Sequence, residues 1–128
     1  MKTNELRIGN YLYLCGWNVM VVGVLEDGVY VNNINTLFKV DITDVRPIPL
    51  TKEFFEKNGF IKASFNCKVF YFKNIKGMIL KAYEHSVGWE IHMQHEERIN
   101  AFSNGIDYVH ELQNAYYVST GEDLEVKL

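Results

Sequence analysis

The sequence predicts an α+β fold: a small SH3-like β-barrel N-terminal half, followed by an antiparallel β-sheet packed against one C-terminal α-helix. Three observations predict it. Short apolar strands and turn residues alternate through residues 1–50, strand patterns continue after them, and the longest run of helical spacing comes last, at residues 106–120. The chain has 128 residues, enough for one domain or for two closely packed halves. We expect residues 1–50 and 51–128 to be such halves, packed together as one compact unit.

The first half is expected to consist of short strands and tight turns. Asp27-Gly28 predicts a type I′ hairpin turn. The apolar run before it predicts a strand with both faces covered, and Gly23 within that run predicts a bulge. Asp41 to Asp44 predict a single helical turn before the last strand. The strands are expected at residues 6–15, 19–25, 29–32, 36–40 and 45–48, with loops at residues 16–18 and 32–35. This layout is that of a small SH3-like barrel, an analogy of architecture that implies no function.

A short helix between the halves is specified locally at both ends. Pro47 and Pro49, the only prolines in the chain, hold the backbone before it extended. Thr51 is a good N-cap for a helix over residues 52–58, and Gly59 can take the left-handed position that ends it. Apolar contacts that would brace the two ends involve Leu50, Phe55 and Phe60.

The second half is predicted to be an antiparallel meander and a helix. Strands are expected at residues 60–64, 67–73, 77–84 and 87–94, with a turn at residues 74–77, an irregular stretch at residues 95–105 and a final edge strand at residues 124–128. In the last strand of the meander, Val87, Trp89, Ile91 and Met93 should face inward. In the helix over residues 106–120, the helical period places Ile106, Val109, Leu112 and Tyr116 in the core and His110, Glu111, Gln113 and Asn114 on the solvent side, with Gly121 ending it.

Composition narrows the function classes. Hydrophobic residues make up 48% of the chain and aromatic residues 14%, which argues against disorder. The net charge of −3 argues weakly against broad binding to a phosphate backbone, although a local basic patch remains compatible with it. Cys15 and Cys67 are far apart and are expected to be buried free thiols. No signal peptide or membrane-spanning run is visible, so we expect a cytoplasmic protein.

No motif indicates catalysis, a cofactor or a metal. His92 and His95 have HxxH spacing, but on a strand their side chains point to opposite faces, so they should not converge on zinc. His110-Glu111 are helix neighbours that do not face each other. We read Glu96-Glu97-Arg98 as a solvated surface, and Ser119 and Thr120 have no histidine at a useful spacing. We therefore expect a protein that is not an enzyme, with no catalytic, cofactor-binding or metal-binding residues.

Aromatic residues leave one alternative open. The stretch Lys68 to Lys73 alternates lysine and aromatic residues and could stack single-stranded bases. The simpler interpretation is a core that uses Phe and Tyr on half-buried strands. Surface Tyr and Trp would also suit a protein interface.

Three blocks of sequence carry a resemblance. They are Asn4 to Tyr11, Arg46 to Thr51 with the helix end at Asn58 to Phe60, and Tyr108 to Asn114 running on to Ser119 to Glu122. They resemble a family of small proteins of unassigned activity encoded by phages, prophages and other mobile elements of gut anaerobes. The resemblance implies an origin in such an element and a compact single-chain unit, with no catalytic residues to carry over. We expect a non-enzymatic protein that binds a host or phage protein, one version being an inhibitor of a host defence complex. The alternative is a nucleic-acid-binding accessory protein.

Overall fold

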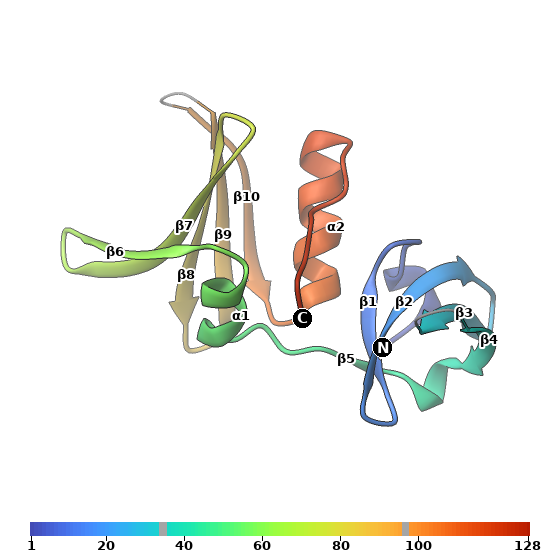
Figure 1. The fold of residues 1–128 in the computed structure, drawn as a ribbon. Coiled ribbons are helices and arrows are strands. Elements are labelled where there is room, and N and C mark those ends of the chain that lie inside the picture. Colours follow the sequence, from blue (N-terminus) through green and yellow to red (C-terminus); the bar gives the residue numbers. More distant parts are fainter. Residues whose placement is uncertain (34–35, 96–97) are drawn as a thin grey trace.

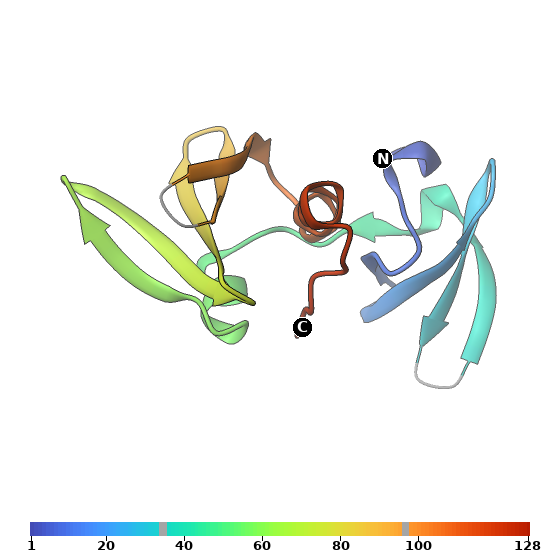
Figure 2. The same cartoon turned by 90° about the horizontal axis from the view of Figure 1, so that it is seen from above.

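The chain folds as two antiparallel sheets with one long helix between them. The computed structural model describes residues 1–33, 36–95 and 98–128, with side chains except at residues 98–102. Each sheet has five strands, and helix α2 (Val109–Thr120) lies between the sheets in both views (Figures 1 and 2). The predicted α+β class is confirmed. Neither helix of the described chain has the length and apolar composition of a membrane span.

The first sheet has the strand order β4-β3-β2-β1-β5. Its elements are the 3-10 turn η1 (Thr3–Glu5), β1 (Tyr11–Leu14), β2 (Trp17–Val24), β3 (Gly28–Asn33), β4 (Thr36–Asp41), the 3-10 turn η2 (Ile42–Asp44) and β5 (Arg46–Pro47). A register shift between Val21 and Gly23 confirms the predicted bulge. The helical turn η2 is also confirmed, with the Asp41 carboxylate accepting a hydrogen bond from the Thr43 amide at 3.0 Å.

Several predictions for this half were wrong. The first strand begins only at Tyr11, because the fully buried side chain of Asn10 accepts a hydrogen bond from the Arg7 amide at 2.7 Å and folds the preceding residues into a turn. Strand β2 buries one face, with Val19 and Val21 inside and Val24 exposed. Asn32 and Asn33 belong to strand β3 rather than to a loop, and the rest of that predicted loop lies outside the described residues.

The hairpin at Asp27-Gly28 is present, but its turn is not type I′. Neither residue has a positive φ, which a type I′ turn needs at both central positions. Gly28 is instead the first residue of strand β3, where a Cβ atom would lie 2.3 Å from the Val40 carbonyl oxygen. Glycine is therefore required by the close approach of strand β4 and not by the turn.

Helix α1 (Lys52–Lys57) begins and ends as predicted. The Thr51 hydroxyl accepts a hydrogen bond from the Phe54 amide at 3.1 Å. Gly59 has φ +81°, and the Phe60 amide donates to the Phe55 carbonyl at 2.9 Å, which is the Schellman pattern. The two rings that were expected to brace this end, Phe55 and Phe60, have centroids 5.0 Å apart.

The second sheet has the strand order β10-β9-β8-β7-β6. Its strands are β6 (Ile61–Phe65), β7 (Lys68–Ile75), β8 (Met78–His85), β9 (Gly88–His95) and β10 (Arg98–Ile106). The predicted meander is confirmed, and Trp89, Ile91 and Met93 are buried as expected. Val87 is exposed because it lies in the turn before strand β9. The irregular stretch predicted at residues 95–105 was wrong, since most of it is strand β10, whose register shifts twice against strand β9.

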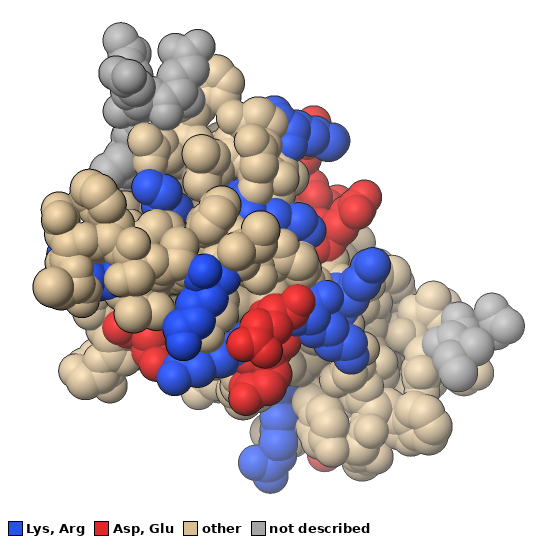
Figure 3. Space-filling model, turned by 60° about the vertical axis from the view of Figure 1, so that its left-hand side comes forward, with Lys and Arg blue, Asp and Glu red and all other residues tan. Residues whose placement is uncertain are grey.

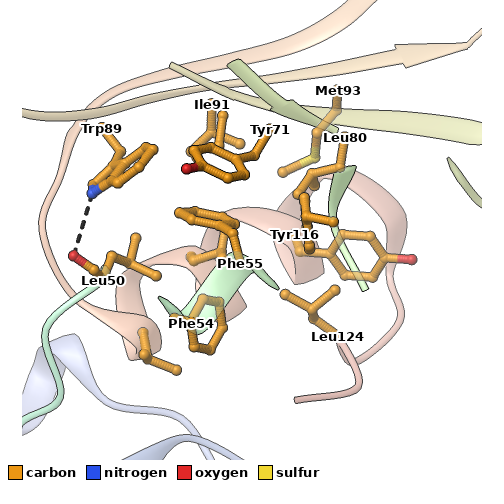
Figure 4. Close-up of a cluster of buried hydrophobic side chains, with 14 residues drawn as sticks. Leu50, Phe54, Phe55, Tyr71, Leu80, Trp89, Ile91, Met93, Tyr116 and Leu124 are labelled. Carbon is orange, nitrogen blue, oxygen red and sulfur yellow. Dashed lines mark hydrogen bonds between the residues drawn. The ribbon is translucent and has the colours of Figure 1, made fainter. Parts of the chain in front are cut away.

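A core of aromatic and aliphatic side chains joins both helices to the second sheet. Phe55 is fully buried at its centre, with ring centroids 4.7 Å from Trp89 and 5.9 Å from Tyr71 (Figure 4). The Trp89 indole donates a hydrogen bond to the Leu50 carbonyl at 3.3 Å. A separate cluster, made of Leu6, Leu12, Val19, Val21, Val29, Val31 and Val45, fills the first sheet.

Helix α2 has two covered faces, so the prediction that His110, Gln113 and Asn114 lie on its solvent side was wrong. Leu112 and Tyr116 pack on the second sheet, while the buried Gln113 faces the first half. The Gln113 side chain accepts a hydrogen bond from the Tyr11 amide and donates one to the Gly9 carbonyl, both at 3.0 Å. The adjacent Asn114 side chain accepts a hydrogen bond from the Asn10 side chain and donates one to the Glu5 carbonyl, both at 2.8 Å. We call these contacts of Gln113 and Asn114 with the first half the polar joint.

An ion pair and a short connection complete the polar joint. Arg7 lies 2.8 Å from Asp123 and stacks its guanidinium 3.6 Å above the Tyr117 ring. The Ile48 carbonyl accepts a hydrogen bond from the Val109 amide at 2.8 Å, so the proline-rich connection runs beside the start of helix α2. Helix α2 itself begins at Val109, because Ile106 ends strand β10, and Gly121 ends it with φ +74° as predicted. All three blocks that carry the family resemblance thus contribute to this joint.

The C-terminal segment is extended but is not the predicted edge strand. The described residues after Gly121 form no strand pairing. Instead the buried side chain of Asn58 holds Lys127 by both backbone groups, accepting from its amide at 2.6 Å and donating to its carbonyl at 2.9 Å. This brings Leu124 into the core cluster that contains Phe54 and Tyr116 (Figure 4).

His110 is buried in helix α2, and its burial should make the free energy of unfolding depend on pH. Its side chain is 2% exposed, its ring stacks on Tyr108 at 5.9 Å, and among the described residues its Nδ1 atom has no hydrogen-bond partner. Burial lowers the pKa of the imidazole below its usual 6.5, more than the nearby carboxylates of Glu111 and Glu5 raise it. The N-terminal amine also lowers this pKa. Below pH 6.5 the unfolded chain therefore binds a proton at His110 more readily than the folded one.

We expect the free energy of unfolding to fall as the pH drops below 6.5, by up to about 1.4 kcal/mol per pH unit for this one proton. Urea unfolding of the wild type and of His110→Gln at pH 7.5, 6.5 and 5.5 measures this contribution. The glutamine variant should show the shallower dependence. Identical slopes for the two proteins would show that His110 is protonated equally well in the folded state.

Candidate interaction surface

The outer face of the second sheet is not covered by either helix of the described chain. The side chains of Tyr71, Leu80, Ala82 and Ile91 are buried on the face that the helices cover. Because side chains alternate along a strand, the residues next to them in sequence point to the opposite, outer face. The outer face includes the side chains of Ile61, Phe65, Phe70, Phe72, Lys81, Tyr83 and His92. Ile61 and Phe65 on the edge strand β6 are 61% and 71% exposed. Exposed apolar side chains that lie together on one face, unlike isolated ones, are typical of a surface that binds a partner.

Aromatic rings form a continuous row across the outer face. The Phe70 ring centroid lies 6.1 Å from Phe72 and 5.2 Å from Tyr83, and Tyr83 lies 4.9 Å from the His92 ring. The Lys81 ammonium is 5.4 Å from the centroid of the Phe70 ring. Such rings provide rigid contact area that loses little conformational entropy on binding.

Lysine is concentrated in the same part of the chain. Between residues 57 and 83 the sequence has no aspartate or glutamate and has lysine at positions 57, 62, 68, 73, 76 and 81. Figure 3 brings the β6–β7 side of the molecule forward and shows separate groups of lysine and arginine side chains on this face, with acidic side chains beside some of them. The local charge is therefore opposite to the net charge of −3. This gap in acidic residues was visible in the sequence and was the signal that the sequence analysis missed.

A cleft opens where strands β7 and β8 separate. Their pairing ends at Tyr71 and Ala82, after which residues 68–70 pair only with strand β6 and residues 83–85 only with strand β9. The hollow between them has a volume of about 430 Å³. Its lining includes Lys52, Lys62, Lys68, Val69, Glu84 and His85. Three lysines against one glutamate give this split cleft a positive charge at neutral pH.

One cluster of titratable groups lies on the outer face. The Glu90 carboxylate is 2.8 Å from His92 Nε2 and 3.5 Å from His85 Nε2. Burial raises the pKa of the adjacent Tyr83 phenol, and the Glu90 charge raises it further. A carboxylate between two imidazoles can orient both rings by hydrogen bonding. In the described chain no group of three His, Cys, Asp or Glu residues has the geometry to hold a metal ion.

Most residues weighed in the sequence analysis do not meet one another. His92 pairs with Glu90, while His95 is exposed at the far end of strand β9. Ser119 and Thr120 lie at the end of helix α2, with Thr120 bonded to the Tyr116 carbonyl at 2.8 Å. Glu96 and Glu97 lie outside the described residues.

The predicted burial of the two cysteines was wrong. Cys15 and Cys67 are exposed, and each lies in a two-residue hairpin turn with positive φ. Both central residues of these turns, Cys15-Gly16 and Asn66-Cys67, have the positive φ of a type I′ turn. Cys67 also lines the split cleft. Apolar and aromatic neighbours suggested burial, but a turn position places a side chain in solvent whatever flanks it.

Comparison with known proteins adds no relative. No family model, curated protein or solved structure matches the chain.

Proposed function

We propose that this is a non-enzymatic binding protein that recognises a protein partner through the outer face of its second sheet. The observation that carries the proposal is the exposed apolar side of strand β6, Ile61 and Phe65, continued inward by the half-buried rings of Phe70, Phe72 and Tyr83. Aromatic residues are enriched in the cores of protein interfaces, and contiguous exposed apolar patches mark binding surfaces. The lysines nearby favour a partner with an acidic surface.

The resemblance to proteins of phages and mobile elements supports a setting for this function. The family blocks contribute to the joint around helix α2, whereas the proposed surface lies between them, in residues 61–92. The segments that resemble the family would then hold the two halves together, and the segment between them would form the binding surface. We propose a host or phage protein as the partner, in the cytoplasm, with inhibition of a host defence complex as one form of the activity.

The order of strands in the first sheet supports a proposal for its architecture. A meander in the order β4-β3-β2-β1-β5 with a 3-10 turn before the last strand is the layout of an SH3-like barrel. We propose that the first half is such a barrel. Architecture of this kind does not identify a ligand, so the functional proposal rests on the second sheet.

A capture experiment with matched variants tests the proposed function. Immobilised wild-type protein is exposed to nuclease-treated lysate of a gut anaerobe, beside the outer-face variant Ile61→Ser/Phe65→Ser. The control Leu37→Ser/Val118→Ser removes two apolar side chains that are 63% and 82% exposed elsewhere on the molecule. The wild type and the control should retain the same protein, and the outer-face variant should lose it. Retention by all three proteins would contradict the proposal.

Binding to nucleic acid is the second candidate. Lys81 above the Phe70 ring and the lysines of residues 57–83 resemble the aromatic and basic surfaces on which single-stranded bases stack. Material that the wild type captures only when nuclease is omitted would favour this function. Its binding should then fall steeply with salt.

A further inference from the structure

We propose that the split cleft between strands β7 and β8 binds an extended acidic segment of the partner protein, which pairs with the free edge of strand β7. This inference rests on the proposed function and names the partner's chemistry at a second part of the same sheet. Three features support it: an interrupted strand pairing, an excess of positive charge, and a hollow of sufficient size.

The interruption of the sheet leaves backbone groups without strand partners. In a two-residue hairpin the pair that flanks the turn is hydrogen-bonded, as are alternate pairs after it. Phe65–Lys68 and His85–Gly88 are such flanking pairs, so Lys68 and His85 direct their backbone groups to strands β6 and β9. Val69 and Glu84, the next residues, therefore direct theirs into the cleft. Both residues are described, and the ladder between strands β7 and β8 does not reach either of them.

A free strand edge is a template for an added strand. An extended peptide that pairs there gains main-chain hydrogen bonds, and its alternate side chains reach the walls of the groove. Val69 is 50% exposed, so the edge is open to solvent. The hollow of about 430 Å³ lies in the range of sites that hold a short ligand segment.

The charges on the walls select an acidic sequence. Lys62 and Lys68 have no ion-pair partner among the described residues. Lys52 pairs with Glu84 at 3.6 Å, but both side chains are exposed, so this ion pair is weak. Lysines on both the β6–β7 side and the helix α1 side can therefore meet carboxylates on alternate positions of an added strand. A basic or neutral segment would leave these charges without partners.

The two cysteines provide a built-in position test. Cys67 lines the cleft and Cys15 does not, yet both are exposed and both lie in two-residue turns. Cys15→Ser leaves one thiol at the cleft, and Cys67→Ser leaves one at the opposite sheet as the control. Alkylation by neutral iodoacetamide, followed by intact mass, reports access to each thiol.

The probe is a synthetic ten-residue peptide of alternating glutamate and valine, with its Kd measured first by fluorescence anisotropy. At ten times its Kd the peptide leaves only about one tenth of the sites empty, so alkylation of Cys67 should slow by about tenfold. Alkylation of Cys15 should not change. Methylating alternate backbone nitrogens of the peptide should abolish the protection, because it removes the donors of a paired strand. Equal protection of both thiols, or of neither, would overturn the proposal.

Charge reversal provides the matched control for the lysines. Lys62→Glu/Lys68→Glu should weaken peptide binding by about tenfold or more, whereas Lys2→Glu/Lys39→Glu, the same change of charge on the first half, should not. If single-stranded dT10 protects Cys67 better than the peptide does, the cleft belongs to nucleic acid and the proposal is wrong. If the peptide fails while the outer-face variant still loses its protein from lysate, this inference fails and the proposed function stands.

Discussion

Replacing Phe55 with alanine should lower the free energy of unfolding by about 3–5 kcal/mol, which is a large part of the stability of a domain this size. The ring is fully buried and touches four other rings, those of Phe54, Phe60, Tyr71 and Trp89, with centroids between 4.7 and 5.9 Å away. Its loss would open a cavity at the point where helix α1, the sheet and the chain after the helix meet. It would also remove the apolar contact that braces the Schellman end.

Urea unfolding followed by circular dichroism measures this loss. Phe65→Ala is the matched control, because the same side chain is removed from a position that is 71% exposed. We expect the control to change the free energy of unfolding by about 0.5 kcal/mol or less. Similar losses for the two variants would show that Phe55 does not occupy the centre of the core.

Leu112→Ala should lower the free energy of unfolding by about 2–5 kcal/mol. Leu112 is fully buried on the face of helix α2 that packs on the second sheet. The helix is held on its other face by the polar joint, so it cannot shift to fill the cavity without breaking the hydrogen bonds of Gln113. We therefore expect a loss in the upper part of this range.

Denaturant melts of Leu112→Ala and of Val118→Ala separate packing from helix propensity. Val118 lies on the same helix and is 82% exposed, so its replacement should have almost no effect. A loss of less than about 1 kcal/mol for Leu112→Ala would place this residue on the wrong face of helix α2.

Features specified by neighbouring residues were predictable from the sequence. The cap at Thr51, the glycine at position 59 and the contact between Phe55 and Phe60 all lie within one short helix and its flanks. The bulge at Gly23 and the helical turn at residues 41–44 are local in the same sense. Each depends on a residue type that favours one backbone conformation.

Features specified by distant residues were not predictable. Gln113 and Asn114 appear to face solvent by helical periodicity, because only the fold brings Gly9 and Glu5 to their side of helix α2. Strand β10 shifts its register twice, and each shift breaks the alternation that marks a strand. The C-terminal segment is held by Asn58, 69 residues earlier in the chain, which no local pattern shows.

The candidate site was predictable only in part. The sequence placed Phe70 and Phe72 on one predicted strand with lysines at both of its ends, and the absence of acidic residues from positions 57 to 83 could have marked the basic region. The sequence does not show that strands β7 and β8 separate after Tyr71 and Ala82. The split cleft arises from that separation, so its lysines become neighbours only in the folded chain.

Backbone amide hydrogen exchange, measured on the wild type alone and with the protein that it captures, tests most directly whether a protein partner binds the β6–β8 part of the second sheet. We predict slower exchange in the complex over residues 61–85, with no change over strands β2 to β4 of the first sheet. Protection confined to residues 17–41 would contradict the claim and place the binding surface on the first half.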